Sequence, residues 1–335
     1  MRLTKNVENY SVFLEDQSGR DAEAYKLELA MALALETSKS LVQVRGGIAD
    51  PAWMTAEAQK IAAGGGDLIK EVRILVDQEL VAQGMNLFYN VGKGAVSKPR
   101  GVFIHYVGRP EEADVVDMAI VGKGVTYDTG GLNVKPTGGM ELMYGDKGGS
   151  CAVLGALKGT LELKVKKNVV FACGFAENAI GADCYKPSDI LRAMNGLSVE
   201  IGNTDAEGRL VMADTMTYVQ RNFKPKKVTY IATLTGASVV ALGKTTGGLF
   251  STDDTMVADW KKASENSHEA LWHMPLNAEH RESIKGKYGA DISNMGAYRW
   301  GGASQAAAFL EHFVEDKRPW AHLDIAGPGV FGEHD

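Results

Sequence analysis

The amino-acid sequence predicts an α/β fold in which helices cover both faces of one sheet. Short apolar runs alternate along the chain with longer stretches that have one apolar face. That alternation is typical of a buried sheet packed between helices. Glycine is plentiful, at 39 residues, and it gathers in loops where the apolar runs end. Because α/β proteins place their ligands in loops at strand ends, these loops are candidates for a functional site.

The predicted elements follow one another in a regular order. A first helix is expected over residues 21–38, where leucine and methionine recur among polar residues. The strands are runs rich in β-branched residues, and the later helices are amphipathic. In chain order the pattern predicts a helix at 55–63, a strand at 71–76, a helix at 77–83, strands at 101–106 and 115–121, a helix at 148–161, a strand at 168–175, a helix at 210–220, a strand at 228–234 and a helix at 303–314.

The composition limits the classes of protein to consider. A chain of 335 residues with 45% hydrophobic and 23% charged residues can form a large core. The net charge of −6 disfavours a nucleic-acid partner, because phosphate binding relies on clustered Lys and Arg. No apolar run approaches the roughly 20 residues that a membrane helix needs, and the three cysteines form no paired motif. We therefore expect a cytoplasmic enzyme with reduced, buried thiols and no membrane partner.

Charged residues follow the predicted strand at 115–121 in a glycine-rich stretch. Lys123 comes directly after the strand and Asp128 one short turn later, so both are expected at the edge of the sheet. Lys135 and Asp146 lie farther along in similar surroundings. The glycine spacing fits neither a Walker A loop nor a dinucleotide-binding turn, which argues against a nucleotide site. A set of structural turns with incidental charges is the plainer alternative.

A second charged stretch, Asn-Thr-Asp-Ala-Glu-Gly-Arg-Leu, begins at Asn203. If it is extended, Asp205, Glu207 and Arg209 share one face, because side chains two apart in a strand point the same way. Paired carboxylates of this kind bind a divalent cation or carry out acid–base chemistry. The seven histidines form no HExxH spacing and no G-x-S-x-G turn is present, so carboxylates are the candidates for catalysis.

These stretches resemble the leucyl aminopeptidase family. The eight residues that begin at Asn203 match the signature of that family, and the resemblance extends from about Val42 to the end of the chain. It implies a mixed, largely parallel sheet flanked by helices on both faces, as in the catalytic domain of the family. It also implies a two-metal aminopeptidase that removes N-terminal residues from peptides. Further matching stretches are 121–131, 135–136, 146–149, 232–237, 300–303 and 322–327.

The resemblance also assigns metal ligands. Two divalent cations, Zn, Mn or Co, would be held by Lys123, Asp128, Asp146, Asp205 and Glu207. Asp128 and Glu207 would bridge the ions, while Lys123 and Asp146 bind one ion and Asp205 binds the other. The charges agree with this assignment, because four carboxylates balance two divalent cations. Lys123 would bind as a neutral amine, which requires that the cations lower its pKa strongly.

The same resemblance assigns catalysis and specificity. Lys135 would act as the electrophile at the scissile carbonyl, and Arg209 would hold a bicarbonate that serves as general base. The free amine of the peptide would bind the metal held by Lys123, which restricts cleavage to the first residue. A pocket suited to Leu or Met side chains would be formed by Met140, Thr233, Gly236 and Ala326. Asn203 is a further expected substrate-binding residue.

Three features depart from the family pattern. Lys147 stands beside Asp146 where the family usually has an apolar residue, so it either weakens the charge balance of the metals or faces solvent. The segment 42–50 lacks the usual Asn-Thr-Pro-Ala-Asn sequence, and both ends of the chain are short. We expect residues 1–38 to be a linker and helix that connect to an N-terminal domain. Residues 39–335 would form the catalytic metallopeptidase domain of a homo-hexamer.

Two other functions remain to be weighed. A non-catalytic scaffold or nucleic-acid-binding regulator on the same fold is the main alternative, and the acidic charge and complete set of site residues disfavour it. A metallophosphatase is also disfavoured, because neither histidine ligands nor a clear phosphate-binding loop is present.

Overall fold

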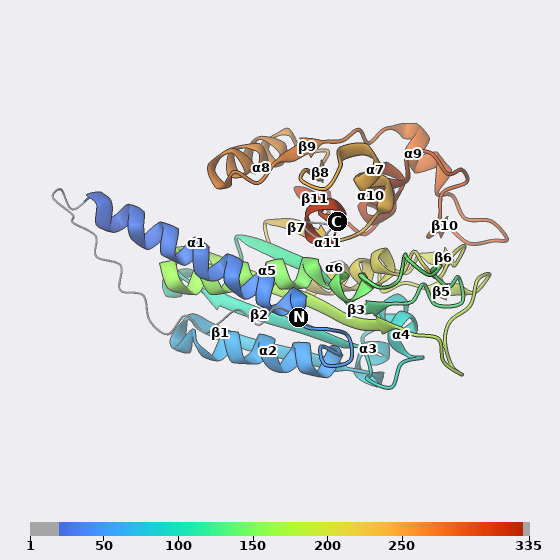
Figure 1. Ribbon diagram of the computed structural model, residues 1–335, viewed down its shortest axis with the longest axis horizontal. Coiled ribbons are helices and arrows are strands. Elements are labelled where there is room, and N and C mark those ends of the chain that lie inside the picture. The colour runs from blue at the N-terminus through green and yellow to red at the C-terminus, as the bar shows by residue number, and fades with distance from the viewer. Residues whose placement is uncertain (1–19, 331–335) are drawn as a thin grey trace.

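The computed structural model describes residues 20–330, and its centre is one eight-stranded sheet (Figure 1). The strand order is β1-β2-β4-β3-β7-β11-β8-β9. Strands β4, β3, β7 and β11 run parallel to one another in the middle, whereas β1, β2 and β8 each have an antiparallel neighbour. The strands span Ile69–Val76 (β1), Arg100–Val107 (β2), Met118–Asp128 (β3), Asn168–Asn178 (β4), Lys227–Ala232 (β7), Gly247–Phe250 (β8), Leu271–His273 (β9) and Trp320–Asp324 (β11).

One face of the sheet is covered by α2 (Pro51–Ala63), α5 (Gly148–Leu163) and α8 (Asp254–Ser267). Their buried apolar side chains form one core with residues of β2, β4 and β11. The long helix α1 (Arg20–Gln43) lies along α5 and makes an outer layer on this side (Figure 1). The expected first helix is thus present and continues five residues beyond position 38.

The opposite face is covered by α3 (Gln78–Ala82), α4 (Asn86–Gly92), α6 (Gly208–Phe223) and α10 (Gly302–Glu311). Almost every residue of α6 is buried, because this helix lies between the sheet and its neighbours α4 and α10. The two largest apolar cores therefore lie on the two faces of one sheet. The predicted α/β fold with helices on both faces is confirmed.

Several short elements were not predicted from the sequence. A separate three-stranded sheet has the order β10-β6-β5 and lies at the side of the molecule where α6 begins (Figure 1). The short elements are β5 (Ile190–Arg192), β6 (Ser198–Glu200), β10 (Ile292–Ser293), α7 (Gly236–Leu242), α9 (Ala278–Ser283) and α11 (Ala326–Val330). With two to seven residues each, they are too short to produce a periodic pattern.

The first turn of α5 lies directly against β3 and β7. A Cβ atom on Gly122 would come within 2.6 Å of Ser150 Cα, and one on Gly149 within 2.1 Å of the carbonyl oxygen of Ile231. Only glycine allows backbones to approach this closely. The two glycines therefore bring the residues that precede α5 next to the ends of the central strands.

Strand β3 differs from the prediction in a way that matters for the site. It does not end at Val121 but continues through Gly122 and Gly124 to Asp128, and β4 pairs with it over this length. Lys123 therefore lies within the strand rather than after it. Glycine weakens a strand on average, so the sequence here looked like a loop. The close packing of α5 explains why glycine occurs in the strand.

The remaining expectations concern the ends of the chain, membranes and cysteines. Residues 1–19, part of the predicted linker, lie outside the described residues. Between residues 20 and 330, no helix combines the length and apolar character needed to cross a bilayer. Cys151, Cys173 and Cys184 are all buried, as expected. Burial raises the pKa of the Cys151 and Cys173 thiols to about 12.

Candidate metal centre

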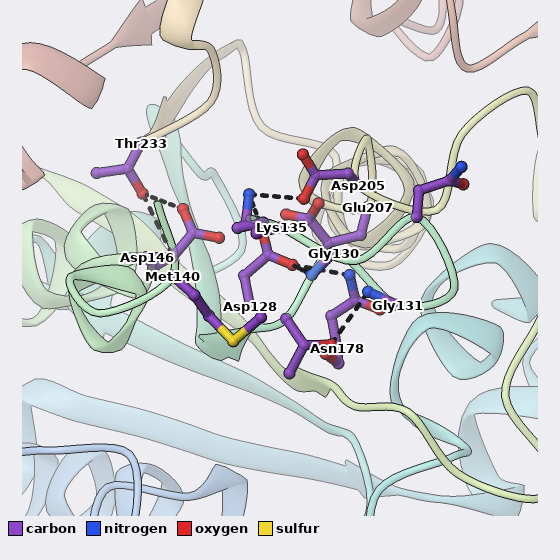
Figure 2. A network of polar contacts seen from close by, with 12 residues as sticks. Asp128, Gly130, Gly131, Lys135, Met140, Asp146, Asn178, Asp205, Glu207 and Thr233 are labelled. Atoms are coloured by element: carbon purple, nitrogen blue, oxygen red, sulfur yellow. Dashed lines mark hydrogen bonds and ion pairs between the residues drawn. The ribbon is translucent and has the colours of Figure 1, made fainter. Parts of the chain in front are cut away.

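Three carboxylates from separate elements converge where the central strands end (Figure 2). Asp128 is the last residue of β3, Asp146 follows the 3₁₀ turn Met143–Gly145, and Glu207 directly precedes α6. All three residues are buried, and each offers an oxygen within 4.8 Å of the others. Asp146 Oδ2 is buried and has no hydrogen-bond partner. A buried oxygen without a donor is costly unless a cation binds it, so these residues fit a divalent metal ion.

Two lysines lie among these carboxylates. Lys123 Nζ is 2.7 Å from Asp146 Oδ1 and 2.9 Å from Glu207 Oε1, and it also donates to the carbonyl oxygen of Thr233. Lys135 Nζ is 2.9 Å from Asp128 Oδ2. Burial alone would lower the pKa of both lysines, but the surrounding carboxylates raise each pKa above its ordinary value. Both side chains are therefore ammonium groups in this arrangement.

The carboxylates respond to burial and to one another. Burial and the charge of Glu207 raise the pKa of Asp128 to about 6, although Lys135 and Lys123 oppose the shift. Burial also raises the pKa of Asp146 well above its ordinary value. For Glu207 burial acts in the same direction, but the two lysines outweigh it and lower the pKa. Negative charge is in excess at this site, which is the condition that a bound cation relieves.

Asp205 lies at the rim of this cluster. Its side chain is 35% exposed, and Oδ1 is 2.6 Å from Lys135 Nζ (Figure 2). The stretch around it is not extended, because Thr204 and Asp205 form a turn and α6 begins at Gly208. The prediction that Asp205, Glu207 and Arg209 share one face of an extended segment is therefore wrong. Arg209 lies in the first turn of α6.

Hydrogen bonds from distant segments hold the turn at Asp205. The backbone N–H of Asp205 donates to Asn203 Oδ1 across 2.7 Å. The backbone N–H of Thr204 donates to Asn133 Oδ1, and Asn294 Nδ2 donates to the carbonyl oxygen of Asn203. In the structure Asn203 therefore orders the turn that carries Asp205.

Arg209 is buried beneath the cluster. Its Nη1 donates to the carbonyl oxygen of Asn294 across 2.7 Å, while Nε is buried and has no hydrogen-bond partner. Burial lowers the pKa of Arg209 to about 10, and the charges of Glu207 and Asp324 oppose this shift. A buried guanidinium with a free N–H suits a small anion such as bicarbonate.

The four proposed pocket residues lie around the same strand ends. Thr233 follows β7, Gly236 begins α7 and Ala326 begins α11, which packs against α7. A Cβ atom on Gly236 would meet no atom within 4 Å, so this glycine borders open space. Met140 is joined to the end of β3, because the Tyr127 hydroxyl donates to its carbonyl oxygen.

Sequence reasoning missed two polar residues that shape the site. Asn178 ends β4, and its Nδ2 donates to Asp128 Oδ1 across 2.8 Å (Figure 2). Asp324 ends β11 and accepts hydrogen bonds from the loop that follows β7. Both are polar residues at the carboxyl ends of apolar strands, and that position was the available signal.

Comparisons with known proteins agree with this site. The sequence matches the catalytic domain of the cytosol aminopeptidase family over residues 36–335. A probable cytosol aminopeptidase of Pasteurella multocida is 42% identical over 298 residues, which cover 89% of this chain and 59% of that protein. A probable cytosol aminopeptidase of Aquifex aeolicus is 40% identical over 309 residues, covering 92% and 61%. The chain thus spans about three fifths of the length of these relatives.

A solved structure is similar over most of the chain. The bottromycin maturation enzyme BotP in complex with Mn superimposes with a TM-score of 0.87 and 34% sequence identity. The match covers 93% of this chain and 67% of that one. The two proteins therefore share one fold over most of the length of this chain.

Proposed function

Because the chain belongs to the cytosol aminopeptidase family, we propose that it is a metal-dependent aminopeptidase that removes N-terminal residues from peptides. The observation that carries the proposal is the buried cluster of Asp128, Asp146 and Glu207, in which one oxygen of Asp146 has no hydrogen-bond partner. A buried cluster of this composition suits divalent cations, because oxygen ligands and excess negative charge favour them.

Two divalent cations would be held by five side chains, those of Lys123, Asp128, Asp146, Asp205 and Glu207. The ions would be Zn, Mn or Co, and BotP, whose structure contains Mn, makes manganese the first to test. When bound, such ions supply Lewis acidity and a water that is deprotonated near neutral pH. Binding requires Lys123 to lose its proton to solvent and Lys135 to leave the carboxylates it now contacts.

Lys135 and Arg209 are the residues we assign to catalysis. Lys135 is charged and lies on a loop at the rim of the cluster, from which its ammonium can donate to the carbonyl oxygen of the scissile bond. A donor aimed at that oxygen stabilises the charge that develops there. Arg209, with its free Nε, would hold a bicarbonate that accepts a proton as general base.

We assign the recognition of the first side chain to the pocket residues. Thr233 lies in the loop after β7, while Gly236 and Ala326 begin the neighbouring helices α7 and α11. Gly236 borders open space. Met140 contributes a flexible apolar side chain. Such a surface suits Leu or Met at the N-terminus of the peptide, with Asn203 completing the substrate-binding set. We further propose that the protein acts in the cytoplasm as a homo-hexamer.

Hydrolysis of leucine amide tests this function. Protein loaded with Mn²⁺ should release leucine, and removal of the metal with a strong chelator should abolish the activity. The matched substrate, N-acetyl-leucine amide, should resist cleavage because its nitrogen cannot bind a cation. Equal rates on the two substrates, or full activity in metal-free protein, would contradict the proposal. A protein that binds Mn²⁺ but cleaves neither amide would support the scaffold alternative.

A further inference from the structure

Lys147, one of the three departures from the family pattern, does not face solvent. The residue immediately follows Asp146 and precedes the first residue of α5. Its relative exposure is 0%, although lysine is among the residues least often buried. Burying an ammonium group is costly unless its donors are satisfied, so its partners explain its presence.

Three backbone carbonyl groups surround the Lys147 ammonium. Nζ donates to the carbonyl oxygen of Val44 across 2.8 Å, to that of Val42 across 3.2 Å, and to that of Tyr144. An ammonium group has three N–H donors, so each has an acceptor. All three acceptors are backbone carbonyl oxygens rather than side-chain carboxylates.

The three carbonyl groups come from two separate parts of the chain. Val42 and Val44 lie at and just beyond the end of α1, whereas Tyr144 lies in the 3₁₀ turn that leads to Asp146. A second contact joins the same parts, because the Arg45 guanidinium lies 3.7 Å from the centre of the Tyr144 ring. The turn before Asp146 is therefore attached to the segment that follows α1.

We propose that Lys147 is a positioning residue whose ammonium serves as a built-in monovalent cation, holding the Asp146 turn in place for metal binding. Carbonyl oxygens arranged around a small cation replace its water shell in the same way. The inference rests on the proposed function, because it concerns Asp146 as a metal ligand. The Asp146 carboxylate is held through Oδ1 by Lys123 and Thr233, and its carbonyl oxygen accepts a second, longer hydrogen bond from the Thr233 hydroxyl. The Lys147 contacts add a hold on the same turn from the side of α1.

The Lys147→Met variant tests the inference, since methionine is similar in length but cannot donate to the carbonyl groups. We expect its affinity for Mn²⁺, measured by competition with a chelating indicator, to fall about 10- to 100-fold, as for other groups that orient metal ligands. Ser38→Ala is the matched control. It removes a hydrogen bond from α1 to the Cys151 carbonyl oxygen in α5 but does not touch the turn, so Mn²⁺ affinity should be unchanged.

Folding must be separated from metal binding. Affinities are compared only for protein that retains the wild-type circular dichroism spectrum. If Lys147→Met does not fold, Arg45→Ala gives the same test, because Arg45 is exposed and its loss leaves the core intact. That variant should weaken Mn²⁺ binding several-fold while Ser38→Ala does not.

The outcomes distinguish this inference from the proposed function. Wild-type affinity in folded Lys147→Met, or in Arg45→Ala where it replaces that variant, would overturn the positioning role and leave the aminopeptidase proposal intact. Tight Mn²⁺ binding by the wild type without hydrolysis of leucine amide would overturn the activity alone. A wild-type protein that binds no divalent cation would overturn both.

Discussion

The hydroxyl group of Thr233 donates to Asp146 Oδ1 across 2.8 Å and joins the loop after β7 to the turn before α5. The carbonyl oxygen of Thr233 also accepts a hydrogen bond from Lys123 across 3.0 Å. A residue that we assign to the substrate pocket therefore touches the carboxylate cluster. Changes in this loop are expected to alter both peptide specificity and metal binding.

Asp324 accepts hydrogen bonds from the same loop after β7, and these contacts give a first prediction. Asp324 Oδ2 accepts a hydrogen bond of 2.6 Å from the Thr235 hydroxyl, and Oδ1 accepts from the backbone N–H groups of Leu234 and Ala326. Thr235→Val should lower kcat/KM for leucine amide about 10-fold, because a hydrogen bond to a buried charge is worth roughly 1.5 to 3 kcal/mol. Thr235→Ser keeps the hydroxyl and should retain activity. Equal losses in both variants would argue against this role.

A second prediction separates metal binding from catalysis. Asp205→Ala should lower metal occupancy and activity together, because it removes a proposed ligand and one negative charge. Lys135→Ala should keep both metals and lose kcat about 10²- to 10³-fold, as when an oxyanion donor is removed. Metal analysis and steady-state kinetics on the two variants check this. Loss of metal from Lys135→Ala would refute the role given to that lysine.

Metal removal should also lower stability. A ligand that binds only the folded state stabilises it by about 2.7 kcal/mol when its free concentration is 100 times its Kd. The thermal unfolding midpoint should therefore rise with Mn²⁺ and fall when a chelator is added. Asp146→Asn, which weakens the cluster, should show a smaller rise. An unfolding midpoint that is independent of Mn²⁺ in the wild type would contradict metal binding at the cluster.

The contact between α5 and the sheet predicts a large effect at Gly149. A methyl group there would meet the Ile231 carbonyl oxygen at 2.1 Å, so Gly149→Ala must displace backbone. Overpacking typically costs about 1 to 3 kcal/mol, and this site should be at or above the upper end. Gly47→Ala is the control, because nothing lies within 4 Å of its added carbon. Chemical denaturation of both variants measures the difference.

The proposed assembly can be tested directly. Light scattering on the purified protein should give the mass of a hexamer, about six times the 36.0 kDa of one chain. A monomer at micromolar concentration would refute the hexamer.

The sequence predicted the main sheet and the site residues for different reasons. The long helices and strands have clear periodic patterns, so α2, α5, α6, β2 and β4 were predicted within a few residues. The charged residues were noticed because Lys123, Asp128 and Glu207 are unusual among glycine and apolar neighbours. Their assignment to particular ions came from the family resemblance rather than from the pattern.

The rest of the site could not be predicted because it depends on contacts between distant residues. The turn at Asp205 is set by Asn133 and Asn294, which lie about 70 residues before it and 90 residues after it. The full length of β3 depends on how closely α5 packs against Gly122. The sequence left open whether Lys147 faces solvent or weakens the charge balance of the metals, and only the fold brings Val42 and Val44 around it. Local patterns carry no information about such pairings.

The buried thiols have a practical consequence for spectroscopy. Cys151 and Cys173 are 1% exposed and have raised pKa values, so neither supplies a thiolate that maleimide or methanethiosulfonate reagents could reach. A cysteine introduced at Val96, whose side chain is fully exposed, would react first. Fluorescent or spin labels could therefore be attached at such a position without replacing Cys151 or Cys173.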